Sequence, residues 1–134
     1  MRSLKLLALP AVLAFTLTGC RSAQIDTTIT NNTPASLKLI EVDYPSASFG
    51  IQTLAPGKSY HYQFKVIGSG NTTVVWTDAA NKSHKSTGPS LNENDNGTLV
   101  IAFGGALTPT WDRHLLNHPE PFAFQTAHTN RRQP

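Results

Sequence analysis

Apolar and polar residues alternate along most of this chain in short runs, and turn residues separate the runs. Between residues 25 and 103 no apolar repeat of 3.6 residues is sustained, so the pattern is typical of strands rather than helices. The expected strands cover residues 25–30, 36–44, 48–54, 59–67, 71–78, 83–87 and 98–103. Short strands at this spacing predict an all-β fold, a single small antiparallel β-sandwich of about seven strands.

The clearest of these runs is residues 59–67, in which apolar and polar side chains fall on opposite faces. The two sets are Tyr60, Tyr62, Phe64 and Val66 against His61, Gln63 and Lys65. Such alternation predicts a strand with one buried face. Residues 98–103 are instead apolar on both faces, which predicts a central strand.

The run at residues 36–44 changes its parity part-way along. Leu37 and Leu39 share one face, whereas Ile40, Val42 and Tyr44 continue on the other. One extra residue in a strand reverses which face its side chains occupy, so we expect a β-bulge near Leu39 or Ile40.

Pro56 and Gly57 lie in the turn before the clearest strand and favour a type II turn there, with a positive φ at Gly57. The strand pattern and the LAPGKSY turn together resemble the immunoglobulin-like or transthyretin-like sandwiches of exported bacterial proteins. The chain has one cysteine, so no internal disulfide can form. Aromatic residues should therefore contribute much of the stability: Phe49, Tyr60, Tyr62, Phe64, Trp76 and Phe103.

After residue 103 the alternation is lost. Residues 104–134 mix four prolines with scattered aromatic residues. We expect an irregular, flexible tail that forms at most one helical turn, around Trp111–Leu116, before Pro119.

The first nineteen residues are typical of a secretory signal peptide. Arg2 and Lys5 precede an apolar stretch from Leu6 to Leu17, and small residues follow it. Roughly a dozen apolar residues are too few to cross a bilayer, which needs about 20. We therefore expect residues 1–19 to be removed on export.

Leu17, Thr18, Gly19 and Cys20 resemble the lipobox of bacterial lipoproteins. The resemblance implies that the chain is cut before Cys20 and that fatty acyl chains such as palmitate are attached to the Cys20 sulfur and to the new amino group. Residues 20–24 would then form a lipidated tether. Arg21 stands where aspartate commonly signals inner-membrane retention, which favours the outer membrane, facing the periplasm. An ordinary signal peptide with an incidental cysteine is the alternative.

The charge of the chain does not favour binding to nucleic acid. Removal of Arg2 and Lys5 with the signal peptide leaves nine basic and eight acidic residues, a net charge of +1. Residues 25–103 hold five lysines and six acidic residues. We therefore expect no nucleic-acid partner.

Two pairs of histidines are candidate metal ligands. His114 and His118 have the spacing of a zinc-binding helix, but Leu115 stands where a zincin needs glutamate, and Pro119 opposes the helix. His61 and His84 are a weaker two-histidine candidate across strands, and both are expected to be exposed. Blue copper needs a cysteine thiolate, and the resemblance commits Cys20 to lipid. The sequence therefore predicts no metal or other cofactor.

Nucleophilic catalysis has no recognisable motif either. Ser59 or Ser83 beside His61 or His84, with Asp78, is a chance assortment, and the G-x-S-x-G elbow is absent. We therefore expect no catalytic residue. The leading hypothesis is a non-enzymatic, lipid-anchored interaction or accessory module of the bacterial cell envelope, with a protein partner there. The alternatives are a small-ligand binder, an inhibitor of an envelope enzyme and, third, a hydrolase.

Overall fold

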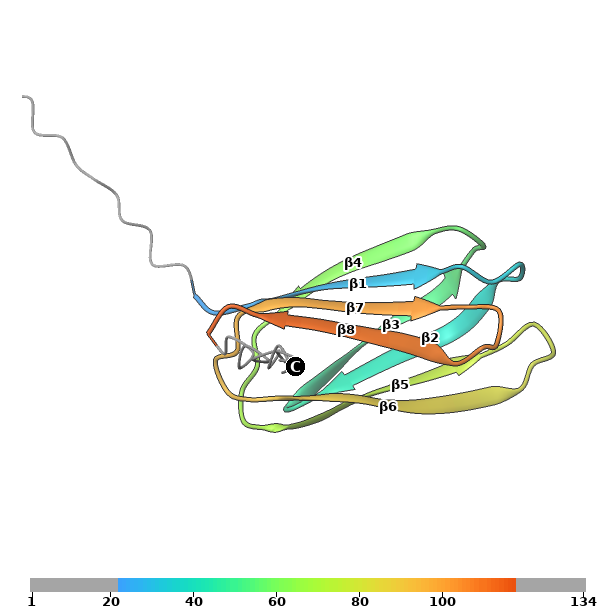
Figure 1. Ribbon diagram of the computed structural model, residues 1–134. Helices are drawn as coiled ribbons and strands as arrows, with labels where there is room; N and C mark the ends of the chain where they lie inside the picture. The colour runs from blue at the N-terminus through green and yellow to red at the C-terminus, as the bar shows by residue number, and fades with distance from the viewer. Residues whose placement is uncertain (1–21, 118–134) are drawn as a thin grey trace, which may run out of the picture.

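Two four-stranded sheets face each other in a sandwich (Figure 1). The computed structural model describes residues 22–117. The strands are β1 (Ile25–Asn31), β2 (Leu37–Tyr44), β3 (Ala47–Leu54), β4 (Ser59–Phe64), β5 (Gly70–Thr77), β6 (Ser83–Leu91), β7 (Gly97–Phe103) and β8 (Pro109–Leu115). The predicted all-β sandwich is confirmed. Within these residues no helix is long and apolar enough to cross a bilayer.

One sheet has the strand order β4-β1-β7-β8, and the other has the order β3-β2-β5-β6. The strand predicted to be central, β7, lies between β1 and β8. Neighbouring strands are antiparallel except for β1 and β7, which run parallel. A parallel pair needs a long connection, and here the chain builds the whole second sheet between these two strands.

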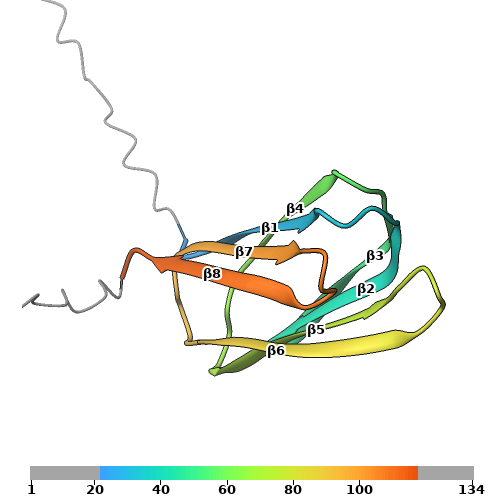
Figure 2. The same ribbon diagram turned by 45° about the vertical axis from the view of Figure 1, so that its right-hand side comes forward.

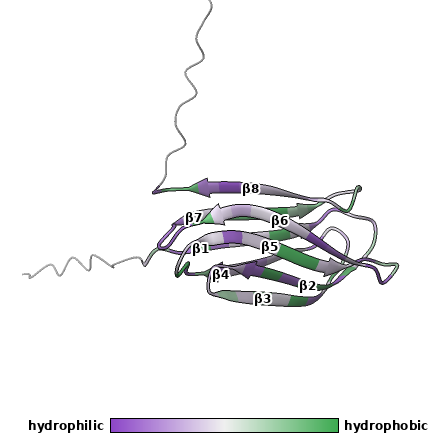
Figure 3. Ribbon diagram, turned by 90° about the horizontal axis from the view of Figure 1, so that it is seen from below, coloured by the Kyte–Doolittle hydropathy of each residue, from purple (hydrophilic) through white to green (hydrophobic). Residues whose placement is uncertain are grey.

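The expectation of an irregular tail from residue 104 is wrong for residues 109–115, and so is the helical turn. These residues form β8, which pairs antiparallel with β7 from Phe103↔Pro109 to Gly97↔Leu115. The strand is polar along most of its length (Figure 3). Its period-two pattern is interrupted by Arg113, which lies between Trp111 and Leu115 on the half-buried face. The rest of the predicted tail, residues 118–134, lies outside the described part of the chain.

The predicted bulge in the second strand is confirmed. The register between β2 and β5 shifts between Lys38 and Glu41, and Leu39 has a φ of 47°. Leu37 and Ile40 are both buried as a result, although their positions differ in parity. Leu39 is the extra residue at the bulge. It does not share the buried face of Leu37 as the sequence pattern predicted, and its exposed fraction is 58%.

The aromatic residues form two groups in the core. Where β3 faces β4, Phe49 stacks on Tyr62 at a centroid distance of 4.2 Å, and Tyr44 stacks on Phe64 at 3.9 Å. Further along the core, Trp76 meets Phe103 edge-on at 5.0 Å. The fully buried aliphatic residues fill the space between the sheets: Ile25, Ile29, Leu37, Ile40, Val42, Val66, Val74, Leu91, Leu99 and Ile101.

The loops divide between two ends of the sandwich (Figure 1 and Figure 2). We call the end where β1 begins the near end; it carries residues 22–24, the turn 45–46, the loops 65–69 and 92–96, and residues 116–117. The opposite end, which we call the far end, carries the loops 32–36, 55–58, 78–82 and 104–108. The alternation of strand direction therefore separates the start of β1 from these four loops by the length of the sandwich.

Candidate functional site

Asn31 ties two loops of the far end together. It is the last residue of β1, and its side chain is fully buried. Its Nδ2 donates hydrogen bonds to the carbonyl oxygens of Ala35 and Leu54, both at 2.8 Å. Its Oδ1 accepts from the backbone N–H of Thr33 at 3.0 Å and from the Thr33 hydroxyl at 2.6 Å. One side chain thus fixes the loop after β1 against the end of β3.

Asp78 organises a third loop in the same way. Its Oδ1 accepts hydrogen bonds from the backbone N–H groups of Ala80 at 2.8 Å and Lys82 at 2.9 Å. The Asp78 backbone also pairs with Lys82, and Asn81 takes a φ of 60° within the turn. Asp78 is 7% exposed, so its carboxylate is enclosed by the loop that it holds.

The second Asp78 oxygen contacts His84. Nε2 of His84 lies 2.7 Å from Oδ2 of Asp78, and because an ionised carboxylate can only accept, this nitrogen carries the proton. The hydrogen bond from His84 lowers the pKa of Asp78 most, and the N–H groups of Lys82 and Ala80 lower it further, against the opposing effect of burial. The ionised form of Asp78 is therefore the one that the far end stabilises.

The His84 ring is also held by an aromatic partner. Trp76 and His84 lie directly opposite on β5 and β6, and their rings stack at a centroid distance of 5.3 Å and an angle of 17°. The Trp76 ring also contacts Phe103 of β7 in the core. Within the described residues, the buried Nε1 of Trp76 has no hydrogen-bond partner. The expectation that His84 is an exposed strand histidine is wrong, because this stack leaves its side chain only 24% exposed.

Two pockets flank this arrangement at the far end, and Leu107 lines both. The first has a volume of about 290 Å³ and is lined mainly by apolar residues: Thr33, Pro34, Ala35, Leu37, Asp78, Ala79, Ala80, Gly105 and Leu107. The second has a volume of about 270 Å³ and lies between β6 and the loop before β8: Trp76, His84, Lys85, Ser86, Ala106, Leu107, Thr108 and Pro109. The first pocket offers mostly hydrophobic contact, and the second also offers the edge of His84.

The serine candidates do not join the Asp78–His84 pair. Ser83 precedes His84 on β6, so its side chain points to the other face of the sheet. The Ser86 hydroxyl accepts from Nε1 of Trp111 at 3.3 Å, and the Ser59 hydroxyl bonds to Thr30 in the other sheet. Among residues 22–117, Asp78 is the one side chain hydrogen-bonded to His84. The geometry therefore holds the loop and presents no nucleophile to the imidazole.

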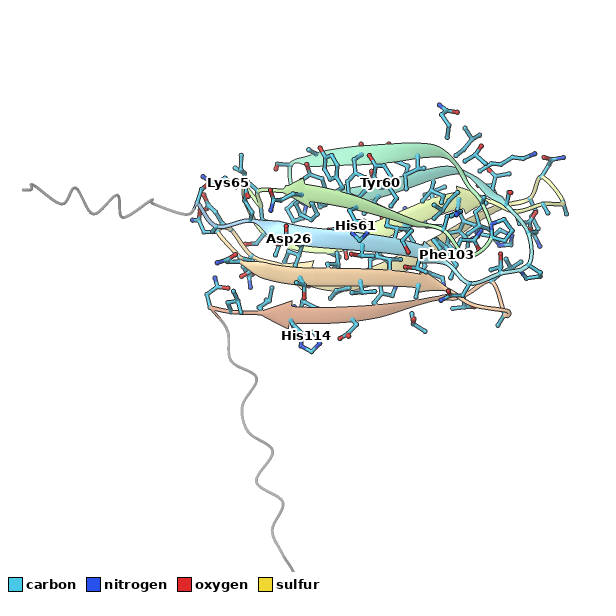
Figure 4. All side chains as sticks on the ribbon, turned by 90° about the horizontal axis from the view of Figure 1, so that it is seen from above. Asp26, Tyr60, His61, Lys65, Phe103 and His114 are labelled. Atoms are coloured by element: carbon cyan, nitrogen blue, oxygen red, sulfur yellow. The ribbon has the colours of Figure 1, made fainter. Side chains whose placement is uncertain are left out.

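Of the two histidine pairs that are candidates from the sequence, His61 and His84 both lie in the described residues, and they are not brought together. His61 lies on β4, where it hydrogen-bonds Thr28 at 3.0 Å, and β4 and β6 belong to different sheets (Figure 4). His114 lies on strand β8 rather than on a helix. Its Nε2 lies 3.2 Å from Oδ1 of Asp112, and both side chains are largely exposed. His118 lies outside the described residues. Residues 22–117 contain no cluster of three or more metal-ligating side chains.

Cys20, the predicted lipidation site, also lies outside the described residues. The roles of Asn31 and Asp78 were missed by the sequence reasoning. The signal for Asn31 is the NNTP turn, since an asparagine that accepts from the N–H two residues later is a common way to begin a turn. The signal for Asp78 is the similar DAANK segment.

No family model and no curated protein sequence matches the chain. Among solved structures, the NMR structure of a protein from Eubacterium rectale is similar over 66% of this chain and 86% of its own length. Its sequence identity is 13% and its TM-score is 0.49.

Proposed function

We propose that this protein is a lipid-anchored, non-enzymatic interaction module of the bacterial cell envelope, which binds a protein partner through its far end. The observation that carries the proposal is the lipobox-like segment Leu17–Cys20, followed after only four residues by the start of β1 at Ile25. Because Arg21 rather than aspartate follows Cys20, the proposed location is the outer membrane, facing the periplasm.

The short tether gives the sandwich a direction relative to the membrane. Five residue steps separate Cys20 from Ile25, and an extended chain spans at most about 3.6 Å per residue, so this reach is at most roughly 18 Å. Strands of seven or eight residues extend the body by a further 25 Å or so. Acylation at Cys20 would therefore hold the near end at the bilayer and leave the far end accessible to partners.

The far end has two properties that suit protein contact. Asn31 and Asp78 hold its loops through side-chain to backbone hydrogen bonds, so little conformational freedom is lost on binding. Its exposed residues include small apolar side chains that allow close backbone approach: Ala55, Pro56, Ala79, Ala80 and Ala106. The occupied oxygens of Asp78 support a structural role for the Asp78–His84 pair, in keeping with a non-enzymatic module.

The anchor is tested by mass spectrometry of the protein purified from membranes. We expect the native chain to begin at an acylated Cys20, and a Cys20→Ser variant to remain an unacylated, unprocessed precursor. Normal processing of the variant, or a bare sulfur at Cys20 in the native chain, would refute the anchor.

Partner contact at the far end is tested by a photoreactive residue placed at Ala80 in intact cells. Ala47 provides the matched control, because it is an exposed alanine at the β2–β3 turn, on the near-end side of the sandwich. We expect a discrete crosslinked protein from position 80 and none from position 47. Crosslinks of equal yield from both positions would contradict a partner site at the far end.

A small-ligand binder is the second candidate, because the first pocket is largely apolar and close to the size of small-molecule sites. A ligand there should raise the melting temperature at saturating concentration. Replacing Ala35, which lines the pocket, by Phe should abolish that shift. A shift that persists in Ala35→Phe would place the ligand elsewhere.

A further inference from the structure

The near end exposes two large apolar side chains. Among residues 22–117 three such side chains are strongly exposed: Leu39, Ile67 and Leu116, with exposed fractions of 58%, 58% and 76%. Ile67 lies in the loop between β4 and β5, and Leu116 directly follows β8, so both belong to the near end. Leu39 lies instead at the bulge of β2, away from the residues that make up this end.

The near end is one continuous surface rather than a set of separate loops. The backbone N–H of Asn94 donates to the Val66 carbonyl at 3.2 Å, which joins the loops 65–69 and 92–96. The N–H of Leu116 donates to the Asn96 carbonyl at 2.7 Å, and the Asn117 side chain donates to the Asn94 carbonyl at 3.2 Å. Ile67 and Leu116 thus project from segments that are fixed to the same central loop.

The same surface adjoins the point where the chain enters the sandwich. The N–H of Gly97 donates to the Gln24 carbonyl at 3.1 Å, and Ser22, Gln24 and Leu116 line one pocket. A lipid-attached Cys20 would therefore hold this surface within roughly 18 Å of the lipid, which is the reach of the tether. The headgroup layer, about 6 Å thick, occupies part of that distance, so the surface would lie close to the headgroups.

Charge at the near end does not oppose contact with lipid headgroups. Lys65 is exposed there, close to the start of β1 (Figure 4), and Glu93 is the exposed acid of the neighbouring loop. Asp95 is fully buried and accepts from the N–H of Asn92. In the sequence, Arg21 adds a positive charge between Cys20 and β1. Asp26, the second residue of β1, is also exposed and lines the same pocket as Leu116. With Asp26 and Glu93 against Lys65 and Arg21, these charges sum to zero, and two apolar side chains beside balanced charges favour shallow insertion into the interface.

We infer that the near end is a membrane-contact surface, in which Ile67 and Leu116 insert into the interfacial layer of the lipid bilayer to which the protein is anchored. The inference rests on the acylation of Cys20 under the proposed function. It adds a second, non-covalent contact, which would hold the sandwich upright and direct the far end away from the bilayer.

The test uses the full chain, exported and processed in cells, with one new cysteine. Ile67→Cys and Leu116→Cys report on the surface, and Leu39→Cys is the matched control because Leu39 and Ile67 have the same exposed fraction. Mass spectrometry first establishes that Cys20 is acylated, so a thiol-reactive fluorophore labels only the new cysteine. Each labelled protein is reconstituted in phosphatidylethanolamine and phosphatidylglycerol vesicles, with and without nitroxide-labelled lipid.

We expect nitroxide lipid to quench the fluorophore at positions 67 and 116 much more strongly than at position 39. Equal quenching at all three positions, with Cys20 acylated, would overturn the membrane-contact surface and leave the anchor intact. A fluorophore at position 67 that is shielded from water but not quenched would show that protein covers the near end, and would also overturn it. A bare Cys20 sulfur would refute the anchor and the surface together.

Discussion

Replacing Asn31 by Ala should remove a large share of the stability of the sandwich. The change deletes both donated and both accepted hydrogen bonds of a fully buried side chain. The single proton of the Thr33 hydroxyl is shared in the wild-type protein between Asn31 Oδ1 and the Ala35 carbonyl, which lies 2.9 Å away, and without Asn31 it can be donated wholly to that carbonyl. The main loss therefore falls on the Leu54 carbonyl and the Thr33 N–H. Each buried polar group that loses a partner costs about 1–3 kcal/mol, which gives a total near 4 kcal/mol.

The measurement is urea unfolding of the wild-type protein and the variant, followed by tryptophan fluorescence. Small domains unfold with about 5–15 kcal/mol, so a loss near 4 kcal/mol moves the midpoint far to lower urea. Asn32→Ala is the matched control, because Asn32 is the exposed neighbour, and its effect should stay within about 0.5 kcal/mol. A loss below about 1 kcal/mol for Asn31→Ala would refute the role of Asn31 in fixing the far end.

Asn31→Asp separates hydrogen bonding from shape. At neutral pH a carboxylate would face two carbonyl oxygens, so we expect this nearly isosteric change to destabilise at least as much as alanine. Protonation at low pH would restore one donor, so the gap between Asn31→Asp and the wild-type protein should narrow there. A variant as stable as the wild-type protein at neutral pH would contradict the donor assignment of Nδ2.

Three further predictions concern the far end, the last strand and the core. The pKa of Asp78 is lowered in the folded state from its ordinary value of 3.8, so its stabilising effect is present above that value and is lost as the pH falls through the lower, folded-state pKa. Urea midpoints measured against pH should therefore fall less steeply in acid for Asp78→Asn than for the wild-type protein. Parallel curves for the two proteins would contradict a stabilising role of the ionised Asp78. Gly88→Ala would place a Cβ 2.5 Å from the Trp111 ring and should lower stability by about 1–3 kcal/mol in thermal unfolding. Gly105→Ala is the control, because a Cβ at Gly105 would meet nothing within 4 Å. Equal melting temperatures for Gly88→Ala and Gly105→Ala would mean that β8 does not pack across β6. Phe103→Ala should cost about 3–5 kcal/mol in urea unfolding, since Phe103 is fully buried, and a cost below about 1 kcal/mol would show that the core collapses around the gap.

The positions of seven strands and of the bulge follow from the sequence because each depends on local side-chain parity. Alternation of apolar residues identifies a strand with one buried face, and the change of parity between Leu37 and Ile40 requires an extra residue there. The turn at Pro56 and Gly57 is local as well: Gly57 has a φ of 71°, and the Lys58 N–H donates to the Ala55 carbonyl at 3.1 Å. Lipidation at Cys20 also depends on a local motif, and it stays a prediction.

The last strand and the far-end site depend on contacts that the local pattern does not contain. Arg113 occupies a half-buried position of β8 because its guanidinium donates to the Ser90 carbonyl on β6, so the polar residue that obscures the strand in the sequence is accommodated by another strand. The DAANK segment signals the turn at Asp78, but the contact of Asp78 with His84 is not visible in the local pattern, since it depends on β6 pairing with β5 so that His84 stacks on Trp76.

Local periodicity therefore determined where the strands lie, because each side chain's face is set by its position in its own run. The tertiary structure alone decided how the strands pair, including the parallel contact of β1 with β7, and which polar side chains meet. The physical reason is that a polar group without a partner is costly where it is buried, as at Asn31 and Asp78, and burial exists only once both sheets have formed.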